Sequence, residues 1–169
     1  MPVPLPIETE RLLIRPFAPG SDSSAMMDVY CDPEVMRFVP GGALPDEAAV
    51  RATLERYARA QAEHGFSSWA VVERQAGRLI GDVGFGTFHP TGDVELGYTL
   101  ARDCWGRGYA TEAARACLTV ALAHLDVPRI VAVVDAQNEA SLRLPERIGM
   151  TRIGNVEAHG RLHALFATR

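Results

Sequence analysis

Residues 96 to 125 read LGYTLARDCWGRGYATEAARACLTVALAHL, and the fold is predicted outward from this stretch. Apolar and polar residues alternate over residues 94 to 100, which predicts a strand. Gly106 and Gly108 then mark a short turn, and the alanine-rich apolar run after it predicts a helix that is buried nearly all round. Backbone N–H groups at such a turn and helix start point outward with a partial positive charge. This layout therefore suits an anion such as phosphate.

The glycine turn also has a simpler interpretation, as a tight turn that leads into a core helix. The turn alone does not separate the two interpretations, but two other phosphate-binding motifs are excluded. The nucleotide-binding spacing G-x-x-x-x-G-K-S/T does not occur, and the dinucleotide-binding fingerprint lacks its third glycine and its strand–helix–strand context.

Length and composition predict a single domain over residues 1 to 169. The 47% of hydrophobic and 22% of charged residues are ordinary for a globular protein. The net charge of −4 argues against nucleic acid and anionic membranes as partners. No stretch has the apolar length of a membrane span, and the N-terminus lacks the features of a signal peptide, so we expect a cytoplasmic protein.

The sequence does not predict a metal site. Its three cysteines, Cys31, Cys104 and Cys117, lack the spacing of metal ligands, and its five histidines are scattered. An odd set of unpaired cysteines is typical of reduced thiols in a cytosolic protein.

The rest of the chain alternates between predicted strands and helices, with residues 1 to 8 irregular. Together with residues 94 to 100, we expect strands at residues 9–16, 66–73, 78–88, 129–134, 150–154 and 162–168. Besides the helix after Gly108, we expect helices at residues 21–30, 46–65 and 138–147. These elements form one mixed α/β domain without internal repeats or linkers.

With these elements in place, the sequence resembles the GNAT superfamily of acyl-CoA N-acyltransferases. The pyrophosphate loop of that family reads Q/R-x-x-G-x-G/A, which residues 105 to 110 match at Gly108 and Ala110, with Trp105 in the first position. This tryptophan is familiar in the branch of ribosomal-protein N-terminal acetyltransferases of the RimJ and RimL type. Marks of the same branch are TERLLIRP at residues 9–16, ELGY at 95–98, WGRGYATEA at 105–113, NEASLR at 138–143 and ERIGM at 146–150.

The resemblance implies the fold and the class of reaction. It implies a central mixed sheet of about seven strands, splayed between the fourth and fifth strands and flanked by about four helices. It further implies an acetyl-CoA-dependent N-acetyltransferase, monomeric or homodimeric, that acts on a primary amine such as a protein N-terminus. Two alternatives stay open: an acetyltransferase for a small amine (an aminoglycoside, an amino acid or a polyamine), and a non-catalytic acyl-CoA-binding module.

The resemblance also implies where acetyl-CoA lies. Its pantetheine arm is expected on the backbone of the central strand, at Tyr98, Thr99 and Leu100. Its pyrophosphate is expected at the glycine turn, formed by Trp105, Gly106, Arg107, Gly108, Tyr109, Ala110 and Thr111. Asn138 and Ser141 are further expected contacts, although an asparagine that caps a helix would look the same in sequence.

Two residues are candidates for catalysis. Glu95 is the candidate base, acting through water, because an ammonium has no lone pair and must lose a proton; alternatively it orients the amine or faces solvent. Ser141 is the candidate acid toward the leaving thiolate, or a partner of the acetyl-CoA arm, or a serine that bonds the backbone at a helix start. Pro145 predicts that the helix that carries Ser141 is bent or cut short near Leu144, because proline disrupts a helix interior.

The acceptor site is predicted from aromatic residues. Phe38, Tyr57, Trp69 and Phe88 are the candidates, although aromatic residues at such spacing also occur as ordinary core. Arg37 and His89 lie on loops and are further candidates for contact with the acceptor.

Overall fold

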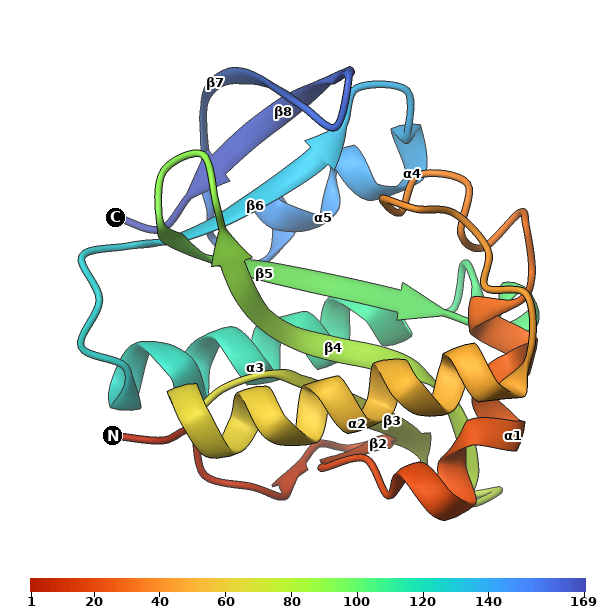
Figure 1. Ribbon diagram of the computed structural model, residues 1–169. Coiled ribbons are helices and arrows are strands. Elements are labelled where there is room, and N and C mark those ends of the chain that lie inside the picture. Colours follow the sequence, from red (N-terminus) through yellow and green to blue (C-terminus); the bar gives the residue numbers. More distant parts are fainter.

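A computed structural model describes residues 1–169 and contains one eight-stranded sheet with the order β1-β2-β3-β4-β5-β6-β8-β7 (Figure 1). The β5–β6 pair is parallel, and every other neighbouring pair is antiparallel. The strands are β1 (Ile7–Glu8), β2 (Leu12–Arg15), β3 (Ser68–Glu73), β4 (Arg78–Phe88), β5 (Asp93–Leu100), β6 (Ile130–Asp135), β7 (Thr151–Ala158) and β8 (Arg161–Ala167).

Helices cover both faces of the sheet, with α1 and α2 on one side and α3 on the other (Figure 1). The helices are α1 (Pro19–Tyr30), α2 (Glu47–His64), α3 (Tyr109–His124), α4 (Glu139–Leu142) and α5 (Leu144–Arg147), with a 3₁₀ turn η1 (Arg102–Cys104) after β5. The side chain of Asp46 accepts a hydrogen bond from Ala49 N–H at 2.9 Å at the start of α2, and Gly65 ends that helix with φ +77°. These are the cap residues that the sequence predicts.

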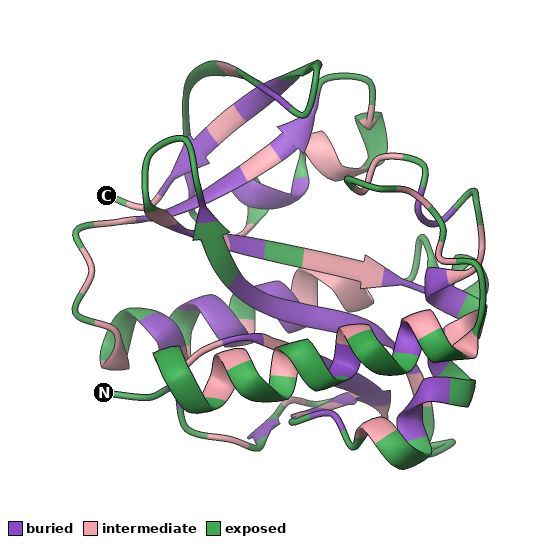
Figure 2. Cartoon of the chain, in the orientation of Figure 1, coloured by how far each residue is buried: buried purple, intermediate pink, exposed green.

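The core lies between the sheet and the helices, and burial is concentrated on the strands and on the inner helix faces (Figure 2). Helix α3 packs closely on the sheet because small residues occupy its inner face: Ala113, Ala114, Cys117 and Ala121 are all buried. The expectation that this helix is buried nearly all round is wrong for its outer face, where Leu122 is 51% exposed. No helix in the structure is both long and apolar enough to span a membrane.

The structure confirms the predicted fold and corrects three elements. The sheet has an eighth strand, because residues 7 and 8 pair with β2. The closing hairpin is longer than predicted, since β7 extends to Ala158. The single helix predicted over residues 138–147 is divided at Arg143 into α4 and α5, with Pro145 in the first turn of α5. A proline is tolerated there because its missing N–H would have no partner in the first turn anyway.

The sheet is splayed between β5 and β6, the strands that correspond to the predicted fourth and fifth. They pair only at Val94 with Ile130 and at Glu95 with Val131, and then diverge. Ala101 N–H donates to the carbonyl of Ile80 in β4 at 2.8 Å. Because backbone groups alternate sides along an antiparallel strand, those of Tyr98 and Leu100 then point away from β4, into the opening.

Candidate active site

A cleft of about 1200 Å³ occupies the splayed part of the sheet. Its walls come from β5, the turn before α3, the segment after β6 and the loop between α1 and α2. It gathers all the residues predicted for the site except Arg107 and Trp69. The predicted residues that line it are Phe38, Tyr57, Phe88, Glu95, Tyr98, Thr99, Leu100, Trp105, Gly106, Gly108, Tyr109, Ala110, Thr111, Asn138 and Ser141, and Arg37 and His89 also line it.

The glycine turn presents free backbone amides to this cleft. Gly106 and Gly108 have φ values of +72° and +79°, which favour glycine. Gly108 is the N-cap of α3, where it has no side chain to cap the helix. The first helical bond is from Glu112 N–H to Gly108 O, so the N–H groups of residues 109 to 111 lack intrahelical acceptors. This arrangement fits an anionic group, and the two glycines allow its close approach.

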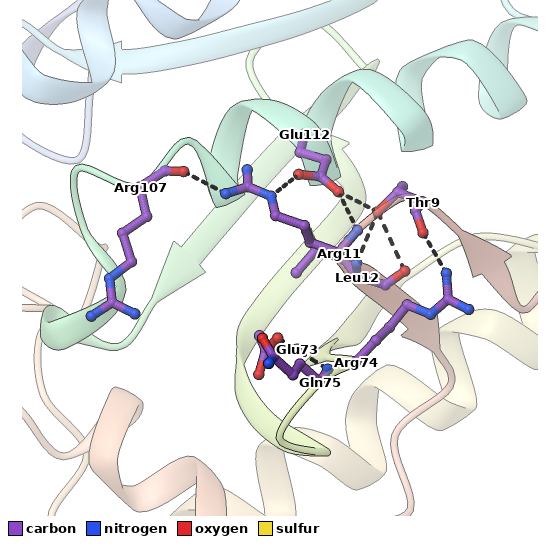
Figure 3. Close-up of polar contacts among 8 residues, drawn as sticks. All are labelled: Thr9, Arg11, Leu12, Glu73, Arg74, Gln75, Arg107 and Glu112. Carbon is purple, nitrogen blue, oxygen red and sulfur yellow. Dashed lines mark hydrogen bonds and ion pairs between the residues drawn. The ribbon is translucent and has the colours of Figure 1, made fainter.

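A polar cluster anchors this turn to the start of the chain (Figure 3). The carboxylate of Glu112 accepts bonds from Thr9 Oγ1 at 2.6 Å, from Arg11 N–H at 2.9 Å and from Arg11 Nε at 2.7 Å. Arg11 Nη1 also donates to the carbonyl of Arg107 at 2.8 Å, and the guanidinium lies 4.4 Å from the ring centre of Tyr109. Burial alone would raise the pKa of the Glu112 carboxyl, but these bonds bring it below its ordinary value.

The sequence interpretation did not identify Thr9 and Arg11 as part of the site. Both belong to the TERLLIRP stretch, which served only as a mark of resemblance. One sequence feature could have identified them. Glu112 is an acidic residue in the first turn of the helix after the glycines, and the arginines of the TERLLIRP stretch are possible partners for it. Arg107, in contrast, contributes its carbonyl to Arg11, and its side chain makes no hydrogen bond or ion pair within the chain.

Trp105 holds the end of β5. Its indole Nε1 donates to the carbonyl of Leu100 at 2.9 Å, while half of the side chain stays exposed. The Leu100 carbonyl therefore already has a partner. The N–H and carbonyl of Tyr98 and the N–H of Leu100 remain available in the cleft, whereas the backbone groups of Thr99 face β4.

Glu95 is a carboxyl group without a partner inside this cleft. It makes no hydrogen bond or ion pair within the chain, and burial raises its pKa to about 7. Added Cβ atoms at Gly86, its register partner, and at Gly97 would meet nothing within 4 Å. Open space therefore surrounds the carboxyl group, and it titrates close to neutral pH, as a base that takes a proton from an amine requires.

Helix α4 places Ser141 on the opposite wall. Asn138 caps α4, because its side chain accepts from Ser141 N–H at 3.4 Å. Tyr98 Oη donates to the Ser141 carbonyl at 3.5 Å, which ties β5 to α4. The break caused by Pro145 falls after Ser141, so it leaves this serine on an intact turn with its hydroxyl group unpaired.

The predicted acceptor aromatics divide into two groups. Phe38, Tyr57 and Phe88 line the cleft. Trp69 does not, because it is only 1% exposed and donates its indole N–H to Gln61 at 2.8 Å. It is a core residue that packs edge-on against Phe85, with ring centres 5.7 Å apart.

A second carboxyl group with a raised pKa lies on β4, outside the cleft, and was not predicted. Asp82 is 5% exposed on β4, opposite Thr99, and burial raises its pKa to about 7, although the nearby polar groups of Tyr30, Thr99 and Ser68 oppose the shift. Nothing in its sequence context marks it, because its burial depends on helices α1 and α2 covering this face of the sheet.

The cysteines are poor candidates for covalent chemistry. Cys104 and Cys117 are buried, and burial raises the pKa of both thiols, that of Cys117 strongly. A nucleophilic cysteine needs the opposite shift, because the thiolate is the reactive form. No three His, Cys, Asp or Glu side chains are grouped so that they could hold a metal ion.

Comparison with known proteins agrees with this geometry. The chain matches the family described as "Acetyltransferase (GNAT) domain" over residues 11–151. It is 32% identical over 148 residues to the uncharacterized N-acetyltransferase YnaD of Bacillus subtilis (strain 168), covering 88% of this chain and 84% of that protein. The crystal structure of an acetyltransferase from Agrobacterium tumefaciens str. C58 superposes with a TM-score of 0.83 at 28% identity, covering 98% of this chain and 95% of that one.

The fold is also shared with a more distant enzyme. The Microcin C7 self immunity acetyltransferase MccE, solved in complex with acetyl-CoA and AMP, superposes with a TM-score of 0.80 at 14% identity, covering 95% of this chain and 93% of that one. At that identity the likeness concerns the fold alone. The splayed sheet, the glycine turn before α3 and the match over residues 11–151 lead to one conclusion: this chain is an acetyltransferase that belongs to the GNAT family.

Proposed function

We propose that this acetyltransferase uses acetyl-CoA and transfers the acetyl group to a primary amine by direct attack in a ternary complex. One observation carries the proposal. A single cleft contains both an uncapped helix start suited to an anion and a carboxyl group that titrates near pH 7. The first feature suits the pyrophosphate of acetyl-CoA, and the second suits the removal of a proton from an amine.

The residues of the cleft fit acetyl-CoA. The amides of residues 109 to 111 would hold its pyrophosphate, and the free backbone groups of Tyr98 and the N–H of Leu100 would bond its extended arm as a strand bonds its neighbour. Acetyl-CoA supplies a thioester, so that an N–C bond forms at its acetyl carbon as the C–S bond breaks. The complex of acetyl-CoA with a protein of the same fold supports this assignment.

Glu95 would prepare the amine. An alkyl ammonium with a pKa of about 10.4 is almost fully charged at neutral pH, whereas an α-amino group with a pKa of about 7.7 to 8.0 is partly free. A carboxylate with a pKa of about 7 accepts a proton from either, through a water molecule, without remaining permanently protonated. The open space beside Gly86 and Gly97 gives the amine room to approach.

Ser141 would assist the departing thiolate. Its hydroxyl group has no partner within the chain, and Asn138 holds its backbone in place. A thiol with a pKa of about 8.5 leaves tolerably as a thiolate, so this assistance is worth less than the removal of the proton by Glu95. Positioning of both substrates in one cleft is expected to contribute most of the rate.

The experiment that tests the proposal measures CoA release with acetyl-CoA and a panel of amines. The panel contains peptides with free N-termini, lysine side chains with blocked N-termini, amino acids, polyamines and an aminoglycoside. Release of CoA with any of these amines supports transfer, and its rank order identifies the acceptor class. Binding of acetyl-CoA by calorimetry without CoA release in any arm would instead support the alternative, a non-catalytic acyl-CoA-binding module.

A further inference from the structure

A second cavity of about 260 Å³ adjoins the cleft, and we call it the cationic pocket. It lies between the loop after α1 and the hairpin β7–β8, and it shares Phe38, Asp135 and other wall residues with the larger cleft. Its charged, titratable and aromatic lining residues are Arg37, Phe38, Asp135, His159, Arg161 and His163. The two arginines and the two histidines have no proposed role in acetyl-CoA binding or in catalysis.

Two arginines flank one aromatic ring in this pocket. The guanidinium carbon of Arg37 lies 5.2 Å from the ring centre of Phe38, and that of Arg161 lies 5.4 Å from the same centre. Arg37 forms no ion pair or hydrogen bond with any other residue of the chain. Each of these guanidinium–ring contacts is attractive by itself, and together they place two positive charges beside one ring at the wall of the pocket.

Arg161 is held in place by neighbours that leave part of it free. Its Nε lies 2.9 Å from Asp135 Oδ2, and its Nη2 donates to Gln137 Oε1 at 2.8 Å. Its Nη1 has no partner within the chain. Asp135 neutralises one of the two guanidinium charges, so the charge of Arg37 remains unbalanced in the pocket.

The histidines complete the wall. His163 is buried, and its Nδ1 lies 3.0 Å from the carbonyl of Arg161, which leaves Nε2 without a partner. His159 lies in the two-residue turn of the β7–β8 hairpin with φ +51°, followed by Gly160 with φ +72°. Positive φ values at both positions suit the tight turn of a two-residue hairpin, and histidine is among the residues that adopt this conformation more often than most.

We infer that the amine acceptor also carries an anionic oxygen group, a carboxylate or a phosphate, which binds in the cationic pocket. This inference rests on the proposed function, because it concerns the second substrate of the same cleft. Glu95 and the pocket offer opposite charges within one connected space, and a molecule with an amine and an anion matches both. A polyamine or an aminoglycoside lacks the anion, and its additional positive charges would be repelled by Arg37.

The test compares acceptors that differ only in the anion, with CoA release as the measurement. The carboxylate arms are an amino acid against its amide, and a peptide with glutamate at its second position against the same peptide with glutamine. The phosphate arm is phosphoethanolamine against ethanolamine, and spermidine is included as a cationic acceptor. We expect the anionic member of at least one pair to have a kcat/KM at least about tenfold higher, as charge-assisted bonds to arginine imply.

Variants show whether the pocket causes this preference. Arg37→Gln should lower the ratio of kcat/KM for the anionic to the neutral acceptor by about tenfold, mainly through KM. Arg59→Gln is the matched control, because Arg59 is an exposed arginine on α2 that has no partner and lies outside both cavities. In Arg59→Gln, the ratio of kcat/KM for the anionic to the neutral acceptor should equal that of the wild type.

A binding measurement keeps this inference separate from the proposed function. Inorganic phosphate and acetate are titrated into the protein while the ring resonances of His159 and His163 are followed by NMR. We expect saturable shifts that weaken in Arg37→Gln and not in Arg59→Gln. Equal turnover of both members of every pair, a preference for spermidine, or shifts that do not depend on Arg37 would overturn the inference while acetyl transfer stands. Absence of turnover in every arm would count against the proposed function, and the titration would still decide whether the pocket binds anions.

Discussion

Replacement of Glu95 by glutamine separates its role as a base from its role in shaping the cleft. Glutamine keeps the size of the side chain and its hydrogen-bonding ability but cannot accept a proton from an amine. A general base typically contributes about 10² to 10⁴ in rate, so kcat should fall by that factor at neutral pH. The affinity for acetyl-CoA should hold, since Glu95 lies outside the glycine turn and its backbone groups face β4.

The pKa of Glu95 determines the shape of the pH profile. With a pKa of about 7, the ionised fraction falls from about nine tenths at pH 8 to about one tenth at pH 6. A lysine-like acceptor arrives as an ammonium in this range and loses its proton to Glu95, so log kcat/KM of the wild type should rise with a slope of about one below pH 7 and level off above it. The variant should show a slope of about one throughout, because only the acceptor still titrates.

A stability measurement tests the same pKa without turnover. Burial raises the pKa of Glu95 from 4.5 to about 7, so the folded state favours the protonated form. Wild type and variant should therefore have similar stability near pH 4, below the unfolded pKa. As the pH rises through about 7, the wild type should lose about 1 to 3 kcal/mol relative to the variant, which raises the Tm of Glu95→Gln at pH 8 by at least about 2 °C. Asp82, whose pKa is also about 7, is present in both proteins and cancels in this comparison.

The assays are CoA release from pH 5.5 to 9 and thermal unfolding over pH 4 to 9. Equal slopes for wild type and variant, together with reduced kcat, would show that Glu95 orients the amine and does not accept its proton. An unchanged kcat would remove Glu95 from the mechanism. A Tm difference that does not depend on pH would show that the carboxyl group is solvated and that its pKa is ordinary.

Three further substitutions test other parts of the cleft. Gly108→Ala should destabilise the protein by about 1 kcal/mol, because φ is +79°, and should weaken acetyl-CoA binding in calorimetry. Gly77→Ala is the control, because Gly77 lies in a turn outside the cleft at φ +63° and its replacement carries the same backbone cost. An equal loss of acetyl-CoA affinity in this control would refute the assignment of the pyrophosphate to the glycine turn. Glu112→Gln should cost about 1 to 3 kcal/mol at pH 7, with a deficit that shrinks as the pH falls below about 4.5, since the folded pKa is lowered; a deficit independent of pH would contradict the anchoring role. Gly97→Val should raise the acceptor KM and leave acetyl-CoA affinity unchanged, because a side chain there enters open space in the cleft; an unchanged KM would place the acceptor elsewhere.

Much of the fold could be read from local patterns, because they depend on neighbouring residues. Alternation over residues 94 to 100 predicted β5, and the cap residues Asp46 and Gly65 predicted both ends of α2. Pro145 signalled a disturbed helix, and the structure shows a break after Ser141. The eighth strand was missed because two residues carry too little periodicity to mark a strand.

The candidate site was predicted where a motif is continuous in sequence and missed where it is not. The glycine turn lies within residues 96 to 125 and Glu95 directly precedes them, so residue type and spacing were enough to mark both as candidates. Trp69 could not be distinguished from an acceptor residue, because aromatic side chains serve both core and ligand sites and only burial separates them.

Local sequence patterns were enough to predict most of the strands and helices, the glycine turn and the resemblance to an acetyltransferase family. Contacts between residues that are far apart in the sequence depend on how the chain packs. The tertiary structure joined Thr9 and Arg11 to Glu112, and it brought Arg37 beside Arg161 around Phe38. It also raised the pKa of Glu95, because desolvation depends on what other segments place around a carboxyl group and not on its neighbours in the chain.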